Sequence, residues 1–140
     1  MYDATDSYEL RSGVPDVDTF RHLRTAAGMS DRPAAAVAAG LPQTWYGVTV
    51  HTGDGRTVGM GRIVGDGGMV FQIADVCVLP AHQGRGLGGR IMAGLVAELE
   101  RRAVPGAYVS LIADGDAHRL YAKHGFVGTA PHSVGMHRLV

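Results

Sequence analysis

The sequence has little of several features that define common classes of protein. Its single cysteine, Cys77, excludes an internal disulfide and fits a reducing compartment. Thirteen basic residues balance 13 acidic ones, so no charge excess favours nucleic acid or a membrane surface as a partner. No apolar run reaches the roughly 18 residues of a membrane-spanning helix, and the N-terminal segment is too polar and acidic for a signal peptide. We therefore expect a soluble, cytoplasmic protein.

The length and the hydrophobic content are those of an ordinary globular domain. The chain has 140 residues, of which 46% are hydrophobic. That is enough to bury a core without disulfides or metals. We expect a single domain over residues 1–140.

One stretch, residues 69–102, organises the rest of the chain. Met69 to Leu79 is apolar and rich in β-branched residues, which predicts a buried strand, and Pro80 ends it. A glycine-rich turn follows, and then a helix with leucine or isoleucine at every fourth position from Leu87 to Leu99. A strand, a glycine turn and a helix N-terminus together favour phosphate binding, because backbone N–H groups converge on one concavity.

Three kinds of phosphate-binding loop fit this outline. A Walker A loop needs Lys followed by Ser or Thr, and the turn has neither. The dinucleotide pattern G-x-G-x-x-G is matched by Gly84, Gly86 and Gly89, but residues 80–83 separate it from the strand. Too few residues also follow the next strand for the remaining βαβ units of such a fold. The third kind, discussed next, fits best.

The stretch V-x-L-P-x-x-Q-G-R-G-L-G resembles the central motif of the GNAT superfamily, the acetyl-CoA-dependent N-acetyltransferases. Gln83, Gly86 and Gly88 fill the family pattern Q/R-x-x-G-x-G/A. A second stretch, from Asp114 to Phe126, resembles the family pattern N-x-x-A-x-x-L-Y-x-x-x-G-F. It departs from that pattern at Asp114, where asparagine is commoner and could donate a hydrogen bond that a carboxylate cannot.

The other segments predict a mixed α/β fold. Asp16 to Ala27 reads as a helix capped by Asp16 or Asp18, and Asp31 is placed to cap a second helix that ends near Ala39. Asp114 or Asp116 is placed to cap a short helix, with Gly125 ending it. The predicted strands are Tyr8 to Ser12, Trp45 to Thr52, Thr57 to Val64, Met69 to Leu79, Ala107 to Ile112, one beginning at Phe126, and Val134 to Val140.

The resemblance implies the same architecture in more detail. It implies a GNAT-like, mostly antiparallel central sheet flanked by helices and splayed at its two central parallel strands. The pantetheine arm of acetyl-CoA would fill the gap between those strands, and the first two helices would form one wall of the acceptor site. The residues it implies for the cofactor site are Cys77, Val78, Leu79, Gln83, Gly84, Arg85, Gly86, Leu87, Gly88, Gly89 and Asp114.

The resemblance also implies roles in acetyl transfer. Tyr121 takes the position of the general acid that protonates the leaving thiolate, although a tyrosine beside Leu120 could instead be a core residue. The backbone N–H of Val78 would polarise the thioester carbonyl.

The residues themselves suggest a general base. Asp75, which by alternation would share a face with Ile73 and Cys77, could be that base or could only fix structure. His82, His118 and His124 are alternative bases, although histidines of this kind are more often surface residues than catalytic ones.

Other chemistries are less favoured. A covalent acetyl-cysteine at Cys77 is possible in principle, but a small buried residue in a strand is the simpler interpretation. The histidines have no metal-ligand spacing, so we expect no metal.

The sequence leaves the acceptor open. A small-molecule or peptide amine is expected, with a homodimer as an analogy from the family. The rival functions are a non-catalytic acetyl-CoA-binding regulatory module and, far behind it, a nucleotide-dependent oxidoreductase.

Overall fold

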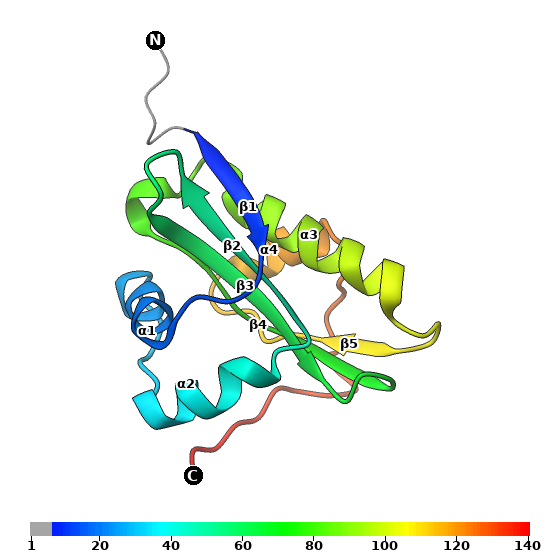
Figure 1. Cartoon of the computed structure of the whole chain (residues 1–140). Helices are drawn as coiled ribbons and strands as arrows, with labels where there is room; N and C mark the ends of the chain where they lie inside the picture. The colour runs from blue at the N-terminus through cyan, green and yellow to red at the C-terminus, as the bar shows by residue number, and fades with distance from the viewer. Residues whose placement is uncertain (1–6) are drawn as a thin grey trace.

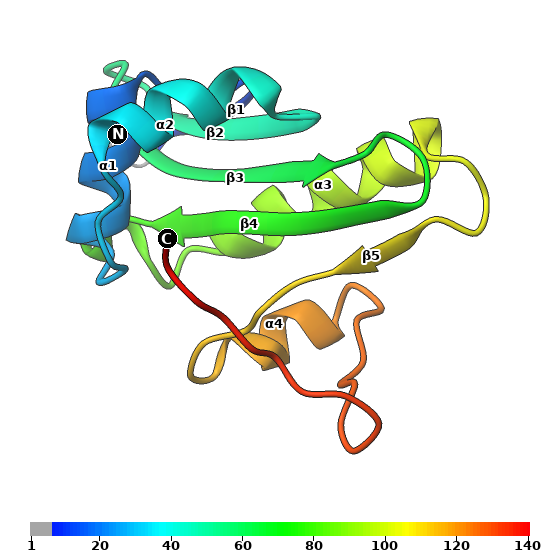
Figure 2. The ribbon, with the colours of Figure 1, turned by 90° about the horizontal axis from the view of Figure 1, so that it is seen from below.

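The computed structural model describes residues 7–140 and shows one sheet covered by helices on both faces (Figures 1 and 2). The sheet order is β1-β2-β3-β4-β5; the first four strands are antiparallel and β5 is parallel to β4. The strands are β1 (Tyr8–Ser12), β2 (Tyr46–Thr52), β3 (Thr57–Gly65), β4 (Val70–Val78) and β5 (Tyr108–Ser110). The helices are α1 (Val17–Ala26), α2 (Ala34–Gly40), α3 (Leu87–Arg102) and α4 (Ala117–Ala122), with short 3-10 turns η2 (Leu41–Gln43) and η3 (Pro80–His82).

The meander from β2 to β4 forms as the turn residues predict. Gly55, in the left-handed region, closes the turn between β2 and β3. The side chain of Asp66 accepts hydrogen bonds from the backbone N–H groups of Gly68, Met69 and Val70, which fixes the turn before β4. Pro80 ends the strand that precedes the glycine turn, as predicted.

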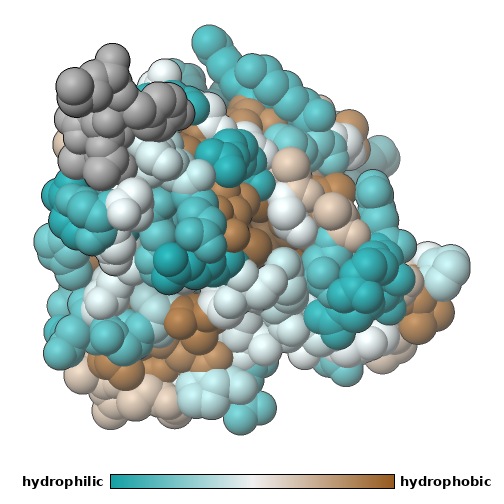
Figure 3. Space-filling view, turned by 45° about the horizontal axis from the view of Figure 1, so that its top comes forward, coloured by the Kyte–Doolittle hydropathy of each residue, from teal (hydrophilic) through white to brown (hydrophobic). Residues whose placement is uncertain are grey.

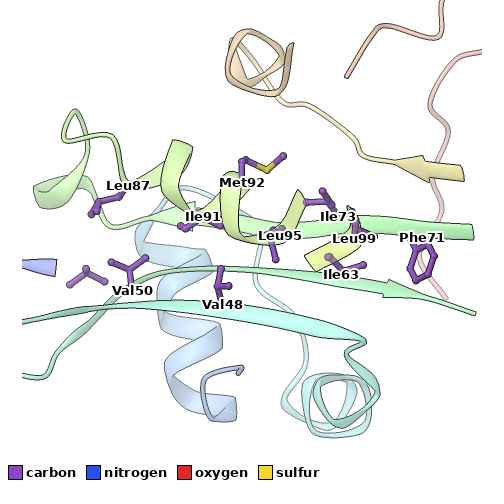
Figure 4. Close-up of a cluster of buried hydrophobic side chains, with 11 residues drawn as sticks. Val48, Val50, Ile63, Phe71, Ile73, Leu87, Ile91, Met92, Leu95 and Leu99 are labelled. Carbon is purple, nitrogen blue, oxygen red and sulfur yellow. The ribbon is translucent and has the colours of Figure 1, made fainter. Parts of the chain in front are cut away.

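Helix α3 supplies the core on one face of the sheet. Its 16 residues begin at the glycine turn, and its fourfold apolar spacing puts Leu87, Ile91 and Leu95 against the strands (Figure 4). The buried members of this cluster are Val48, Val50, Val58, Ile63, Phe71, Ile73, Leu87, Ile91, Met92, Leu95 and Leu99. Within residues 7–140, no helix is both long and apolar enough to cross a membrane.

Helices α1 and α2 cover the opposite face (Figure 2). Asp16 caps α1 as predicted, accepting a hydrogen bond from the Thr19 N–H at 2.8 Å. The predicted capping of α2 by Asp31 is wrong. Pro33 holds the N-cap position without a side-chain bond, and the Asp31 carboxylate pairs with Arg21 at 2.8 Å instead.

Strand β4 carries a bulge that changes which residues face which side. Between its pairings with Arg62 and Met60, β4 advances three residues while β3 advances two. The extra residue falls at Asp75, whose φ is +60°. Asp75 and Cys77 therefore face α1, whereas Ile73 packs with α3. The predicted alternation that grouped Ile73 with Asp75 is wrong because it assumed an uninterrupted strand.

The parallel strands splay as expected. Strand β5 pairs with β4 only at residues 70–72, and beyond Gln72 the two strands have no paired register. The hydrogen-bonding edge of β4 toward its C-terminal end is thus left open on the β5 side. This opening comes at the same end of β4 as the glycine turn.

The last part of the chain differs most from the sequence prediction. Neither Phe126 nor Val134 to Val140 begins a strand, and β5 therefore lies at the edge of the sheet rather than inside it. Val134 and Met136 are exposed, and among the described residues their segment pairs with no strand of the sheet. Asp116 holds the N-cap position of α4, as predicted, but its side chain makes no cap hydrogen bond. Gly125 does adopt the left-handed conformation expected after α4.

Candidate active site

The open edge of β4 presents one residue's backbone to the gap beside β5. The Leu79 N–H donates to the Val58 carbonyl at 2.8 Å, so Leu79 and Val58 form a hydrogen-bonded pair. In an antiparallel ladder, hydrogen-bonded and non-hydrogen-bonded pairs alternate, so the next pair, Val78 with Gly59, is not hydrogen-bonded. The N–H and C=O groups of Val78 therefore point away from β3. The Val78 N–H is consequently directed into the splayed gap, where the resemblance places the thioester.

The glycine turn lies directly after this edge. Gly84 and Gly86 have φ values of +77° and +79°, and a Cβ built at either position would meet nothing within 4 Å. These two positions need glycine for their backbone conformation, and they leave open space in front of the N-terminus of α3, where Gly86 is the N-cap residue. The Gln83 side chain donates to the Val78 carbonyl at 2.9 Å and so ties the turn to the end of β4.

The other glycines of the turn serve packing. A Cβ at Gly88 would lie 3.2 Å from a methyl group of Leu120, and one at Gly89 would lie 4.0 Å from the same side chain. Their small size therefore lets α4 approach α3. Leu87, between them and the turn, is buried in the core. Arg85 is exposed, with its guanidinium carbon 5.9 Å from the centre of the Tyr8 ring.

Tyr121 lies on α4, the helix that follows β5 in the chain. It is partly buried and packs against the α3 core. Burial raises the pKa of its phenol, and the negative charge of Asp114 raises it further. A phenol with a raised pKa carries its proton at neutral pH, as a proton donor must.

Asp114 occupies the position at which the family commonly has asparagine. It is exposed in the loop before α4, and its backbone carbonyl accepts from the Ala117 N–H at 3.0 Å. The backbone of this residue thus supports the start of α4. Its side chain is oriented toward solvent and influences Tyr121 only through its charge.

Asp75 lies between two guanidinium groups. One carboxylate oxygen accepts from Nη1 of Arg24 at 2.6 Å and the other from Nε of Arg62 at 2.7 Å. Arg24 is only 4% exposed and also donates to the backbone and hydroxyl of Ser30. Each oxygen of Asp75 thus accepts a charge-assisted hydrogen bond, which fixes the carboxylate within an ion network.

Sequence reasoning missed this ion network, although it left one signal. Arg24 shares the apolar face of its helix with Phe20 and Leu23, and a buried guanidinium requires a carboxylate partner. Asp75 is the only carboxylate on the central strand. The ion pair of Arg24 with Asp75 could therefore have been predicted from the sequence pattern, whereas the contact of Arg62 with Asp75 could not.

The remaining candidates from the sequence are Cys77 and three histidines. Cys77 is buried, and its burial raises the pKa of the thiol to about 12, so the protonated form dominates and a covalent acetyl-cysteine is disfavoured. His82, expected at the surface, is buried, and its Nδ1 lies 2.8 Å from the Tyr8 hydroxyl. His118 is exposed and His124 is partly exposed. Among the described residues, no group of three or more His, Cys, Asp or Glu could hold a metal ion.

Comparisons with known proteins agree with this geometry. The acetyltransferase (GNAT) domain matches residues 44–128, more than half of the chain. The chain is 30% identical over 133 residues to GCN5-related N-acetyltransferase 2, chloroplastic, of Arabidopsis thaliana, which covers 81% of this chain and 51% of that protein. It is 29% identical over 136 residues to histone acetyltransferase TAP1 of Glycine max, which covers 89% and 58%. It therefore spans only about half the length of these curated relatives.

A solved structure matches almost the whole chain. It is a protein of unknown function from meticillin-resistant Staphylococcus aureus, itself described as a probable acetyltransferase. The two chains are 41% identical with a TM-score of 0.90, and the match covers 95% of this chain and 99% of the other. The family match, this fold and the splayed strands before a glycine turn lead to one assignment. The chain belongs to the GNAT family of acetyltransferases, which use acetyl-CoA as the acetyl donor.

Proposed function

We propose that this protein transfers the acetyl group of acetyl-CoA directly to a primary amine. The observation that carries the proposal is the open edge of β4, where Val78 directs its N–H into the gap beside β5. That N–H would polarise the thioester carbonyl. The glycine turn, with its left-handed Gly84 and Gly86 at the start of α3, would hold the pyrophosphate.

The chemistry that follows is a direct displacement. The amine nitrogen attacks the thioester carbonyl, the carbon–sulfur bond breaks, and the thiolate of CoA takes the phenolic proton of Tyr121. The acceptor ammonium releases one proton to solvent before the attack, and the second proton, shed by the nitrogen as the amide forms, restores the phenol of Tyr121. In this proposal Asp75 positions Arg24 and Arg62 rather than removing a proton from the amine, because both of its oxygens already accept from guanidinium donors.

Calorimetric titration of the purified protein with acetyl-CoA tests the cofactor site, with NADH and ATP as controls. We expect saturable binding of acetyl-CoA alone. Gly86→Asp should abolish it, because the new carboxylate meets the phosphates. Gly106→Asp is the matched control, since Gly106 is also left-handed and unobstructed but lies at the other end of α3. Normal binding by a folded Gly86→Asp variant would overturn the placement of the phosphates.

A free-thiol assay with a panel of amines then tests transfer. We expect Tyr121→Phe to lower turnover about 100-fold with little change in acetyl-CoA affinity, since a positioned acid typically contributes that much. Tyr108→Phe, which alters an exposed tyrosine on β5, is the control. Unchanged turnover in Tyr121→Phe would remove the acid role. Binding without transfer to any amine would favour a regulatory module instead.

A further inference from the structure

A small hollow of about 100 Å³ lies on the α1/α2 face, directly over the ion network of β3 and β4. It could hold about three water molecules, or a carboxylate or phosphate group of similar size. Both apolar and charged side chains line it. Its lining residues are Phe20, Arg32, Ala36, Val37, Gly40, Leu41, Arg62 and Asp75.

The charges around this hollow do not cancel. Three arginines, Arg24, Arg32 and Arg62, gather near one carboxylate, that of Asp75. The nearby Asp31 carboxylate is paired with Arg21, outside the hollow. A positive excess that is partly shielded from water is an attractive environment for an anion.

Arg62 is held in place with donors to spare. Its Nε donates to Asp75 at 2.7 Å and its Nη1 donates to the Thr44 hydroxyl at 3.0 Å, which leaves three of the five guanidinium N–H groups. The Phe20 ring lies 5.9 Å from its guanidinium carbon and supports the plane of the group. A fixed guanidinium with free N–H groups is suited to an oxyanion, since little side-chain entropy is lost on binding.

The strained backbone at the centre of the network is consistent with a functional site. Asp75 is the only described residue other than glycine with a positive φ, and it sits at the bulge that turns its carboxylate toward Arg24 and Arg62. Such strain persists where the surroundings hold it and often marks a binding or catalytic site.

We propose that this hollow binds an anionic group of the acceptor, a carboxylate or a phosphate, through Arg62 and Arg32. The inference rests on the proposed acetyl transfer and narrows its acceptor to an amine that also carries an anion. The network and the proposed thioester position lie on the same strand, three residues apart from Asp75 to Val78. At about 3.3 Å per residue this is at most roughly 10 Å, because the bulge at Asp75 shortens the strand, and several bonds separate the amine from the anion.

A matched series of acceptors tests the proposal. The series compares amines that carry an anionic group with alkylamines of equal length that lack one. The anionic members are glycine, 4-aminobutyrate, 6-aminohexanoate and 2-aminoethyl phosphate. Turnover is measured by thiol release, and binding to the CoA-loaded protein is measured by calorimetry. We expect the anionic members to be preferred about tenfold or more, with 6-aminohexanoate better than glycine. The phosphate member shows which anion the hollow prefers.

Two variants assign the preference to the hollow. Arg32→Gln and Arg62→Lys should each reduce the preference for anionic acceptors several-fold while acetyl-CoA binding is unchanged. Arg11→Gln, which removes an exposed arginine on β1, is the control. The proposal would be overturned if amines with and without an anionic group were used and bound equally. It would also be overturned by a preference for glycine, or by a preference for anionic acceptors that stays undiminished in both variants. Failure of acetyl-CoA to bind would instead contradict the proposed function, and calorimetry detects this without any acceptor.

Discussion

The two faces of the sheet are built on different principles. On the α3 face, every member of the buried cluster is apolar, and the helix was readable from its fourfold spacing. On the α1/α2 face, a smaller apolar cluster surrounds the buried ions of Arg24, Arg62 and Asp75. On the face of the molecule in Figure 3, hydrophilic groups are interrupted by hydrophobic patches.

This difference indicates that the two faces have different roles. Apolar packing on the α3 face holds the glycine turn and β4 in fixed positions, whereas an ion network is a costly way to obtain stability. A buried network that persists next to a hollow suits recognition better than support. If this comparison is right, substitutions on the two faces should have separable consequences.

The largest effect is expected at the network. Asp75→Ala leaves two guanidinium groups without their carboxylate in a site where Arg24 is 4% exposed. We expect a loss of about 3–5 kcal/mol in the free energy of unfolding, measured by urea denaturation. The triple variant Arg24→Met, Arg62→Met and Asp75→Leu should recover most of it, since no buried charge remains unpaired. A loss below about 1 kcal/mol in Asp75→Ala would show that the network is well solvated.

A core truncation on the α3 face should cost nearly as much. Ile91 is fully buried between α3 and the strands (Figure 4). Ile91→Ala should lower the free energy of unfolding by about 2–5 kcal/mol through lost burial and a cavity. The folded fraction should keep its acceptor preference, which distinguishes this face from the other. A changed preference would mean that the two faces are not independent.

Overpacking on the same face should have a smaller effect. A Cβ at Gly61 would lie 2.6 Å from Ile91 Cγ2 and 3.1 Å from Leu95 Cδ1. Gly61→Ala is therefore expected to destabilise the protein by about 1–3 kcal/mol. Gly40→Ala is the matched control, because a Cβ there meets nothing within 4 Å and α2 gains a better helix former. Equal thermal midpoints for the two variants would contradict the close approach of α3.

The smallest effect concerns alkaline pH. Burial raises the pKa of Cys77 to about 12 from 9.0, so the unfolded chain releases this proton first. The stability contribution is complete below about pH 9 and is lost as the pH rises toward 12. At pH 10 the part already lost amounts to about 1.4 kcal/mol. Denaturation of the wild type and Cys77→Ala at pH 7 and pH 10 measures the difference, and parallel pH dependence would show that the thiol is not buried in solution.

Local patterns were enough for much of the site. The strand before Pro80, the helix from Leu87 and the left-handed Gly125 follow from residues that are neighbours in the sequence, and all three are confirmed. The face of Asp75 was not predictable, because a bulge is set by how β4 pairs with β3 and leaves no mark in the alternation of side chains. The predicted helix cap at Asp31 is wrong for a similar reason, since the carboxylate of Asp31 pairs with Arg21 instead.

The C-terminal segment shows the limit most clearly. The apolar residues from Val134 to Val140 favour a strand, yet a strand exists only where another chain segment supplies its hydrogen bonds. The sequence by itself determined the strand, turn and helix around the glycine motif, because their signals are short-range. Only the tertiary structure decided which carboxylate meets which arginine, how far β5 follows β4 and whether the last residues join the sheet, because each depends on partners distant in the chain.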